Sequence, residues 1–167
     1  MTEETSDQRT YESVDREPVA IVVHCSDPRF QKAFREFIRN ELGLNDGEYI
    51  PFVISGGVAS LSEPLKLPKE FKFMKERIEL FLGLFDSIKR IVLINHEDCR
   101  HYDALKDLLG GLFLRHAPTM AERQQRDLLG VARTLLGLFR PNLALDLYYA
   151  RFLDPDHKQI VFERIQG

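Results

Sequence analysis

The sequence predicts an α/β domain with a doubly wound, mostly parallel sheet flanked by helices and an antiparallel C-terminal edge strand. Runs such as 18–25, rich in β-branched residues, and 89–95, with an unbroken apolar centre, are typical of strands buried on both faces of a parallel sheet. Segments with helical spacing of apolar residues separate the strand-like runs. The final two runs, joined by a short turn at 154–158, are antiparallel if they pair directly.

The expected elements alternate along the chain. Strands are expected at 18–25, 49–54, 89–95, 143–153 and 159–165, and helices at 30–42, 68–85, 102–114 and 119–139. Thr119 followed by Glu122 has the pattern of a capping box, which marks the start of the last helix. Residues 58–68 contain two serines and two prolines and are therefore expected to form a loop.

The chain of 167 residues has the length of one ordinary domain. Residues 1–17 carry almost no apolar side chains, so we expect a flexible N-terminal arm there. The domain itself is expected to span residues 18–167, since its first apolar run begins at Pro18.

Charge and composition exclude several classes of function. The formal net charge of −3 and the absence of a Lys/Arg block argue against a nucleic-acid-binding surface. No apolar run approaches the ~20 residues that span a bilayer, and the acidic N-terminus is unlike a signal peptide. A cytoplasmic protein that binds neither nucleic acid nor membrane is therefore expected. Its two cysteines are too few for a disulfide scaffold and indicate metal or redox chemistry.

Two short polar segments follow predicted strands and carry metal-binding residue types. Cys25 ends the first strand, and His96 and Cys99 follow the third with two residues between them. Zinc favours thiolate and imidazole ligands, and three protein ligands leave a fourth position open for chemistry. The alternatives are that both cysteines are ordinary core residues or that they form a disulfide.

Asp27 and Arg29 lie on the loop that leaves the first strand, close enough to pair. Arginine grips a carboxylate through two parallel hydrogen bonds. Asp27 could coordinate the metal itself, or it could pair with Arg29 and accept a hydrogen bond from the attacking hydroxide. The alternative is an ordinary loop ion pair, which contributes little when it is exposed.

The combined pattern, Cys-x-Asp-x-Arg at 25–29 and His-x-x-Cys at 96–99, resembles the β-class carbonic anhydrases over residues 18–107. The resemblance implies a parallel-centred sheet with zinc at its strand ends, a homodimer or a higher assembly, and carbon dioxide or bicarbonate as substrate. It implies that Cys25, His96 and Cys99 are the zinc ligands and that Asp27 and Arg29 form the catalytic dyad. Asp98 matches a residue that the family often has before the second cysteine, and Gly56-Gly57 matches its glycine-containing turn.

The chain departs from this family at three places. Arg100 replaces the glycine that usually follows the second cysteine, and a cation there could occlude the substrate pocket or bind bicarbonate. The turn at 54–57 reads Ile-Ser-Gly-Gly in place of Arg-Asn-Ala-Gly. The gap between the two motifs is longer than in compact members, with residues 58–73 as the expected insertion. Gly56, Gly57 and Arg100 are therefore candidate pocket residues.

The leading hypothesis is a zinc enzyme that hydrates carbon dioxide reversibly, built on a zinc-binding domain at 18–167. One alternative is a related hydrolase for carbonyl sulfide or carbon disulfide, and another is a non-catalytic zinc-stabilised binding or sensing protein. A proton leaving the site could use a histidine. However, His24 is expected to face the other side of the sheet, and His101 and His116 are expected on the surface.

Overall fold

The computed structural model describes residues 9–110, 119–139 and 142–166 of the chain. The strands are, in chain order, β1 (Ala20–Cys25), β2 (Tyr49–Ile54), β3 (Arg90–His96), β4 (Ala144–Phe152) and β5 (Ile160–Arg164). The helices are α1 (Gln31–Asn40), α2 (Ala59–Ser62), α3 (Pro68–Leu84), α4 (Arg100–Leu109) and α5 (Met120–Leu138).

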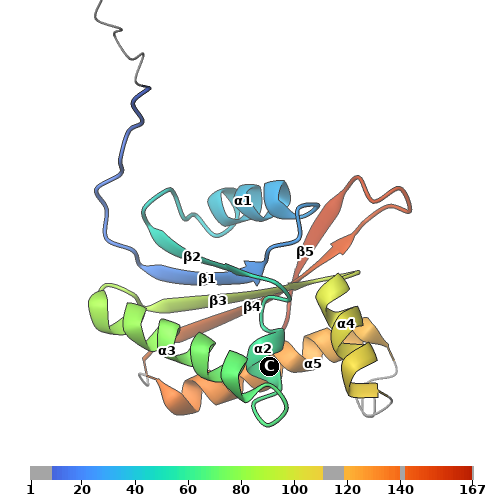
Figure 1. Ribbon diagram of the computed structural model, residues 1–167. Coiled ribbons are helices and arrows are strands. Elements are labelled where there is room, and N and C mark those ends of the chain that lie inside the picture. The colour runs from blue at the N-terminus through green and yellow to red at the C-terminus, as the bar shows by residue number, and fades with distance from the viewer. Residues whose placement is uncertain (1–8, 111–118, 140–141, 167) are drawn as a thin grey trace, which may run out of the picture.

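The strands form one five-stranded sheet in the order β2-β1-β3-β4-β5 (Figure 1). Neighbouring strands are parallel from β2 through β4, and β5 is antiparallel to β4 at the edge. Helix α1 covers one face of the sheet, and α3 and α5 cover the other (Figure 1). The predicted fold class, including its antiparallel C-terminal edge strand, is confirmed.

The two central strands are buried on both faces, as their unbroken apolar sequences predict. Every residue of β1 is buried, and so is every residue of β3 after Arg90. Alternate side chains enter different cores, because successive residues of a strand point to opposite faces. Ala20 and Val22 pack with the phenylalanines of α1, whereas Ile21 and Val23 pack with α2, α3 and α5.

The structure corrects two predicted elements. Residues 58–68 are not wholly loop, because Ala59–Ser62 forms the short helix α2. Its apolar residues are buried against the α3 and α5 side of the sheet, and this burial outweighs the local serine and proline content. Helix α4 starts two residues earlier than predicted and ends at Leu109, where Gly110 donates its N–H to Lys106 O.

The direction of winding along the sheet reverses between β1 and β3. From β1 the chain moves outward to β2, then crosses back over β1 to β3 and continues outward in the other direction. In doubly wound sheets this reversal leaves a crevice beyond the carboxyl ends of the two strands, where ligands bind. Cys25 is the last residue of β1 and His96 is the last residue of β3.

The described part of the predicted N-terminal arm, residues 9–17, contains no helix or strand. Arg16 on this segment forms an ion pair of 2.7 Å with Glu48, next to the start of β2. Residues 1–8 lie outside the described part of the chain. Within that part, no helix has the length and apolar character needed to cross a bilayer.

Thr119→Ala is expected to lower the free energy of unfolding by about 1 kcal/mol, because the Thr119 hydroxyl accepts the Glu122 N–H at the start of α5. The Glu122 carboxylate accepts the Thr119 N–H in return, so the predicted capping box is present. Thr134→Ala is the matched control, because Thr134 lies within the same helix, where alanine is well tolerated. Urea unfolding measures both changes, and equal losses would contradict the capping role.

Candidate metal centre

Cys25 enters the site from the end of β1. Its side chain is buried, and its sulfur accepts the backbone N–H of Gly56 at 3.3 Å. Gly56 belongs to the turn that follows β2, the neighbouring parallel strand, whose last residue pairs with Cys25. Two strand ends therefore form this side of the site, one with the thiol and the other with a backbone donor.

His96 enters from the end of β3 with a defined orientation. Its Nδ1 lies 2.7 Å from the carbonyl oxygen of Glu97. Because a carbonyl only accepts, Nδ1 carries the hydrogen and Nε2 has a free lone pair. This Nε2 is buried and has no hydrogen-bond partner among the described residues. A buried nitrogen left without a partner calls for an explanation, and a bound metal ion provides one.

Cys99 lies three residues beyond His96, directly before the first residue of α4. The Tyr102 N–H donates to the Cys99 carbonyl oxygen at 2.9 Å and so ties the first turn of α4 to this residue. The backbone N–H groups of His101 and Tyr102 act to lower the pKa of the Cys99 thiol, because the N-terminus of a helix favours negative charge. The start of α4 therefore suits Cys99 as a thiolate.

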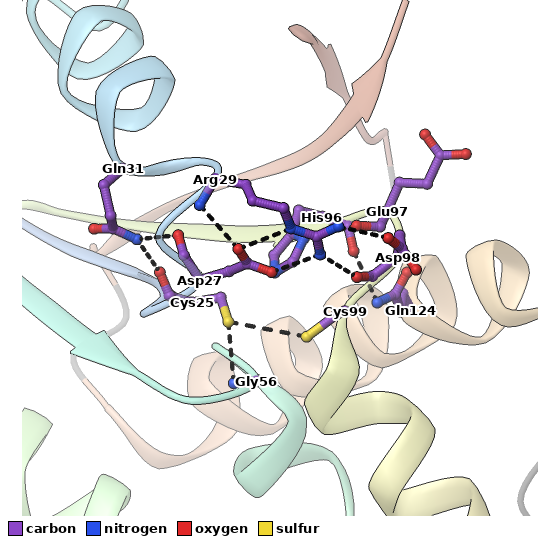
Figure 2. Close-up of polar contacts among 10 residues, drawn as sticks. All are labelled: Cys25, Asp27, Arg29, Gln31, Gly56, His96, Glu97, Asp98, Cys99 and Gln124. Carbon is purple, nitrogen blue, oxygen red and sulfur yellow. Dashed lines mark hydrogen bonds and ion pairs between the residues drawn. The ribbon is translucent and has the colours of Figure 1, made fainter. Parts of the chain in front are cut away.

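The three predicted ligands converge, as Figure 2 shows. Cys25 Sγ, His96 Nε2 or Nδ1, and Cys99 Sγ all lie within 4.8 Å of one another. The two sulfurs are 3.9 Å apart, far beyond a disulfide bond of roughly 2 Å. Two thiolates at about 2.3 Å from a tetrahedral zinc ion would lie about 3.8 Å apart. The donor set, the spacing and the free Nε2 fit a zinc ion.

The two thiols influence each other strongly. A hydrogen bond from the Cys99 thiol lowers the pKa of Cys25 to about 4, and His96 and the Gly56 N–H act in the same direction. The same interaction with Cys25, together with burial, raises the pKa of Cys99. The two pKa values move in opposite directions because one thiol donates to the other sulfur, so a second thiolate beside the first is unfavourable unless a cation is bound.

A buried polar network holds the backbone of His96. Gln124 on α5 is fully buried and donates from Nε2 to His96 O at 2.9 Å. The Tyr149 hydroxyl donates to Gln124 Oε1, and the Asn95 amide donates to Gln124 O. On the other side, the ring of Phe30 packs against the His96 imidazole at 4.2 Å. The sequence analysis missed Gln124, because a glutamine within a helix carries no local signal of burial.

Asp27 and Arg29 form the predicted pair beside the cluster (Figure 2). Arg29 donates from Nε to Asp27 Oδ1 at 3.1 Å and from Nη2 to Asp27 Oδ2 at 2.8 Å. These hydrogen bonds hold the pKa of Asp27 below its ordinary value. The Asp27 side chain is 9% exposed, so this is not an ordinary solvated loop ion pair. Gln31 on α1 donates to the carbonyl oxygens of Cys25 and Asp27 and so fixes their loop.

A cavity of about 270 Å³ opens in front of the cluster. It is lined by Cys25, Ser26, Asp27, Pro28, Arg29, Ser55, Cys99, Arg100 and His101. Arg100 therefore lies where the sequence analysis expected it, at the wall of the pocket. Gly56 and Gly57, the other two candidate pocket residues, are not among the residues that line this cavity. A Cβ at Gly57 would lie 3.2 Å from Ile94 O and 3.3 Å from Asn95 Oδ1.

The structure corrects the expectation for His101. This residue is not a simple surface histidine, because it lines the cavity and its Nδ1 lies 3.1 Å from Ser55 Oγ. Burial lowers its pKa. Its place two residues after Cys99, in the first turn of α4, is the sequence signal that could have identified it. His24 packs on Phe34 of α1, away from the cavity, as predicted, and His116 lies outside the described residues.

Gly56 is required by both its backbone and its surroundings. Its φ of +79° is unfavourable for other residues, and a Cβ there would lie 2.2 Å from His101 Cδ2. The turn therefore brings the Gly56 N–H to Cys25 while leaving room for the imidazole of His101. Ser55 and Gly56 together fix the position of the His101 ring.

The fold is similar to those of solved carbonic anhydrases. The β-carbonic anhydrase isoform I from Trichomonas vaginalis matches with a TM-score of 0.57 and 14% identity, over 92% of this chain and 87% of that chain. The carbonic anhydrase from Streptococcus mutans matches with a TM-score of 0.51 and 13% identity, over 94% and 88%. The carbonic anhydrase from Glaciozyma antarctica matches with a TM-score of 0.52 and 16% identity, over 90% and 84%. No protein-family model and no curated protein matches the sequence.

Gly56→Ala is expected to destabilise the protein more than Gly43→Ala. Both glycines have positive φ, but a Cβ at Gly43 would meet nothing within 4 Å, whereas at Gly56 it would collide with His101. Combining Gly56→Ala with His101→Ala should recover part of the loss, because the colliding ring is gone. Urea unfolding of Gly43→Ala, Gly56→Ala, His101→Ala, the double variant and the wild type measures this coupling. Equal costs for the two glycine variants would rule out the contact as the cause.

Proposed function

We propose that this chain is a zinc enzyme that converts carbon dioxide and water reversibly into bicarbonate and a proton. One observation carries the proposal. Cys25, His96 and Cys99 converge, and the two cysteines line a cavity whose wall also includes the paired Asp27 and Arg29. The likeness of the fold to solved carbonic anhydrases supports it, because each of the three matches covers at least 90% of this chain.

Cys25, His96 and Cys99 would hold the zinc ion. When bound, zinc acts as a Lewis acid that lowers the pKa of water and makes hydroxide available near neutral pH. The chain offers three ligands, and zinc sites with three protein ligands keep a fourth position for chemistry. The Gly56 N–H donates to the Cys25 sulfur and would draw charge from that thiolate, so the metal would keep more of its Lewis acidity.

Asp27 would orient the attacking water. As a carboxylate it only accepts hydrogen bonds, so it can hold the O–H of an attacking group and direct the oxygen lone pair toward carbon dioxide. Arg29 keeps the Asp27 carboxylate ionised and fixes its plane through two hydrogen bonds. In this arrangement Arg29 does not touch the reacting atoms, and it acts through Asp27.

Arg100 would interact with the anionic product. It lines the cavity beside Cys99, and bicarbonate is a planar oxyanion that a guanidinium can grip with two donors. The hydroxyl groups of Ser26 and Ser55 line the same cavity and add further hydrogen-bonding groups. The pocket is therefore more polar than carbon dioxide alone requires, and it suits the hydrated product.

A homodimer belongs to the same proposal. It is implied by the resemblance of the two motifs to the β-class family, and β2 ends the sheet with one unpaired edge in the described structure. Unpaired edges of sheets are common places for a second chain to add.

Zinc-loaded protein is expected to hydrate carbon dioxide well above the buffer rate, and Asp27→Asn is expected to lower kcat roughly 100-fold. The amide keeps the shape of the carboxylate but loses its charge and one acceptor. Stopped-flow hydration with a pH indicator measures the rate, and the metal content of each preparation is determined in parallel. Asp46→Asn is the matched control, because Asp46 also pairs with an arginine, Arg39, but lies outside this cavity.

The proposed carbon dioxide hydration would be refuted if folded, zinc-loaded wild-type protein showed no turnover over a broad pH range. The same preparation would then be assayed with carbonyl sulfide and carbon disulfide, since the departure at Arg100 alters the pocket wall in which such substrates would bind. Equal losses in Asp27→Asn and Asp46→Asn would remove Asp27 from the mechanism.

Chelation of the metal is expected to abolish turnover while the protein stays folded. The two large cores of the sheet are built from residues other than the ligands, so the fold does not depend on the metal for its apolar burial. Circular dichroism and thermal unfolding before and after dialysis against a chelator measure this, and zinc addition should restore activity. Complete unfolding without metal would indicate a structural zinc site instead.

A further inference from the structure

Asp98 occupies an unusual backbone position between two candidate ligands. It lies between His96 and Cys99 and has a φ of +53°, a conformation that non-glycine residues seldom adopt. Aspartate tolerates this region better than most residues, because its short polar side chain can make local hydrogen bonds. Here, however, the Asp98 side chain forms an ion pair with Arg29, which lies on the loop that follows a different strand, β1.

Asp98 grips Arg29 through two acceptors. Arg29 Nη1 donates to Asp98 Oδ2 at 2.6 Å, and Arg29 Nη2 donates to Asp98 O at 2.7 Å. Asp27 occupies the other edge of the same guanidinium, through Nε and Nη2. Figure 2 shows the guanidinium between the two carboxylates. The unusual φ of Asp98 presents both its carbonyl and its carboxylate to Arg29.

The segment that carries Asp98 is itself anchored. The Glu97 N–H donates to Ala150 O at 2.8 Å, and the Glu97 carboxylate accepts the Phe152 N–H at 2.9 Å. Cys99 then begins α4. Asp98 is therefore held from both sides by β4 and by α4, although its own side chain is 49% exposed.

Arg29 is also bounded by aromatic rings. Its Cζ lies 6.0 Å from the centre of the Phe30 ring and 5.8 Å from that of Phe152. These faces favour a cation and limit the movement of the guanidinium. The Arg29 side chain is 34% exposed. If it paired with Asp27 alone, no acceptor would fix the orientation of its Nη1 group.

We infer that Asp98 is a positioning residue, which holds Arg29 in the orientation that fixes the Asp27 carboxylate toward the cavity. The inference deepens the proposed function and rests on it for its catalytic consequence. Arg29 follows β1 and Asp98 follows β3, so their contact joins the two strand exits that carry the candidate ligands. Asp98 acts through Arg29 and has no place among the residues that touch substrate.

Two substitutions at Asp98 separate positioning from backbone conformation. Asp98→Gly removes the carboxylate and suits the positive φ better than aspartate does, so folding and zinc content should be preserved. It is expected to lower kcat roughly tenfold with KM changed less than about twofold, because Arg29 and Asp27 lose their fixed orientation. Asp98→Asn tolerates the same backbone and keeps an oxygen acceptor, so it should retain most of the activity.

Nuclear magnetic resonance of the Arg29 side chain gives a readout independent of turnover. In the wild type, hydrogen bonds on both edges should slow the rotation of the guanidinium and give separate Hη signals. In Asp98→Gly these signals should merge, and in Asp98→Asn they should stay separate. The Hη signals of Arg29 are assigned by comparison with Arg29→Lys, in which they are absent.

Merged Arg29 signals together with reduced kcat in Asp98→Gly would establish the positioning role. Normal turnover in Asp98→Gly would overturn it, whatever the signals show, and would leave Asp98 as a turn residue. Unchanged signals with reduced kcat would also overturn it, since the effect would not pass through Arg29. If the wild type itself has no turnover, the proposed function fails, and the Arg29 signals alone decide whether Asp98 holds the guanidinium.

Discussion

The parallel pairing of β1 with β3 is the constraint on which the site depends. Ala20 through Val23 pair in register with Arg90 through Leu93, and both strands are buried on both faces. Parallel strands end at the same edge of a sheet, so the pairing brings the ends of two distant segments together. Because the winding reverses between these strands, a crevice forms beyond their carboxyl ends. The ligands, the arginine and the cavity all occupy this opening.

Charge is concentrated at this edge and balanced locally. Two thiols and the carboxylates of Asp27 and Asp98 gather around Arg29 and the position of the candidate zinc ion. The Gly56 N–H donates to the Cys25 sulfur, and Arg29 donates to both carboxylates. Such a centre is costly to bury without its cation, since buried charges need partners. The thiol and imidazole donors favour a cation that accepts sulfur and nitrogen ligands.

The wall of the cavity is shaped by two bulky nitrogen-containing side chains, Arg100 and His101, at the start of α4. His101 fits only because Gly56 has no side chain, so the first turn of α4 and the turn after β2 depend on each other. The Ile-Ser-Gly-Gly turn at 54–57 accommodates His101 in two ways: Ser55 contacts the imidazole, and Gly56 leaves space for it.

The sequence by itself determined the fold class, most strand and helix positions and the three candidate ligands. It could do so because buried parallel strands have long apolar centres, and because Cys-x-Asp-x-Arg at 25–29 and His-x-x-Cys at 96–99 together resemble the β-class pattern. It did not reveal α2, the burial of Gln124, the pocket position of His101 or the contact between Arg29 and Asp98. Each of these depends on which residues of distant segments meet, and local sequence patterns carry no information about such contacts. Tertiary packing alone decided them, by bringing α4, α5 and the turn after β2 to one edge of the sheet.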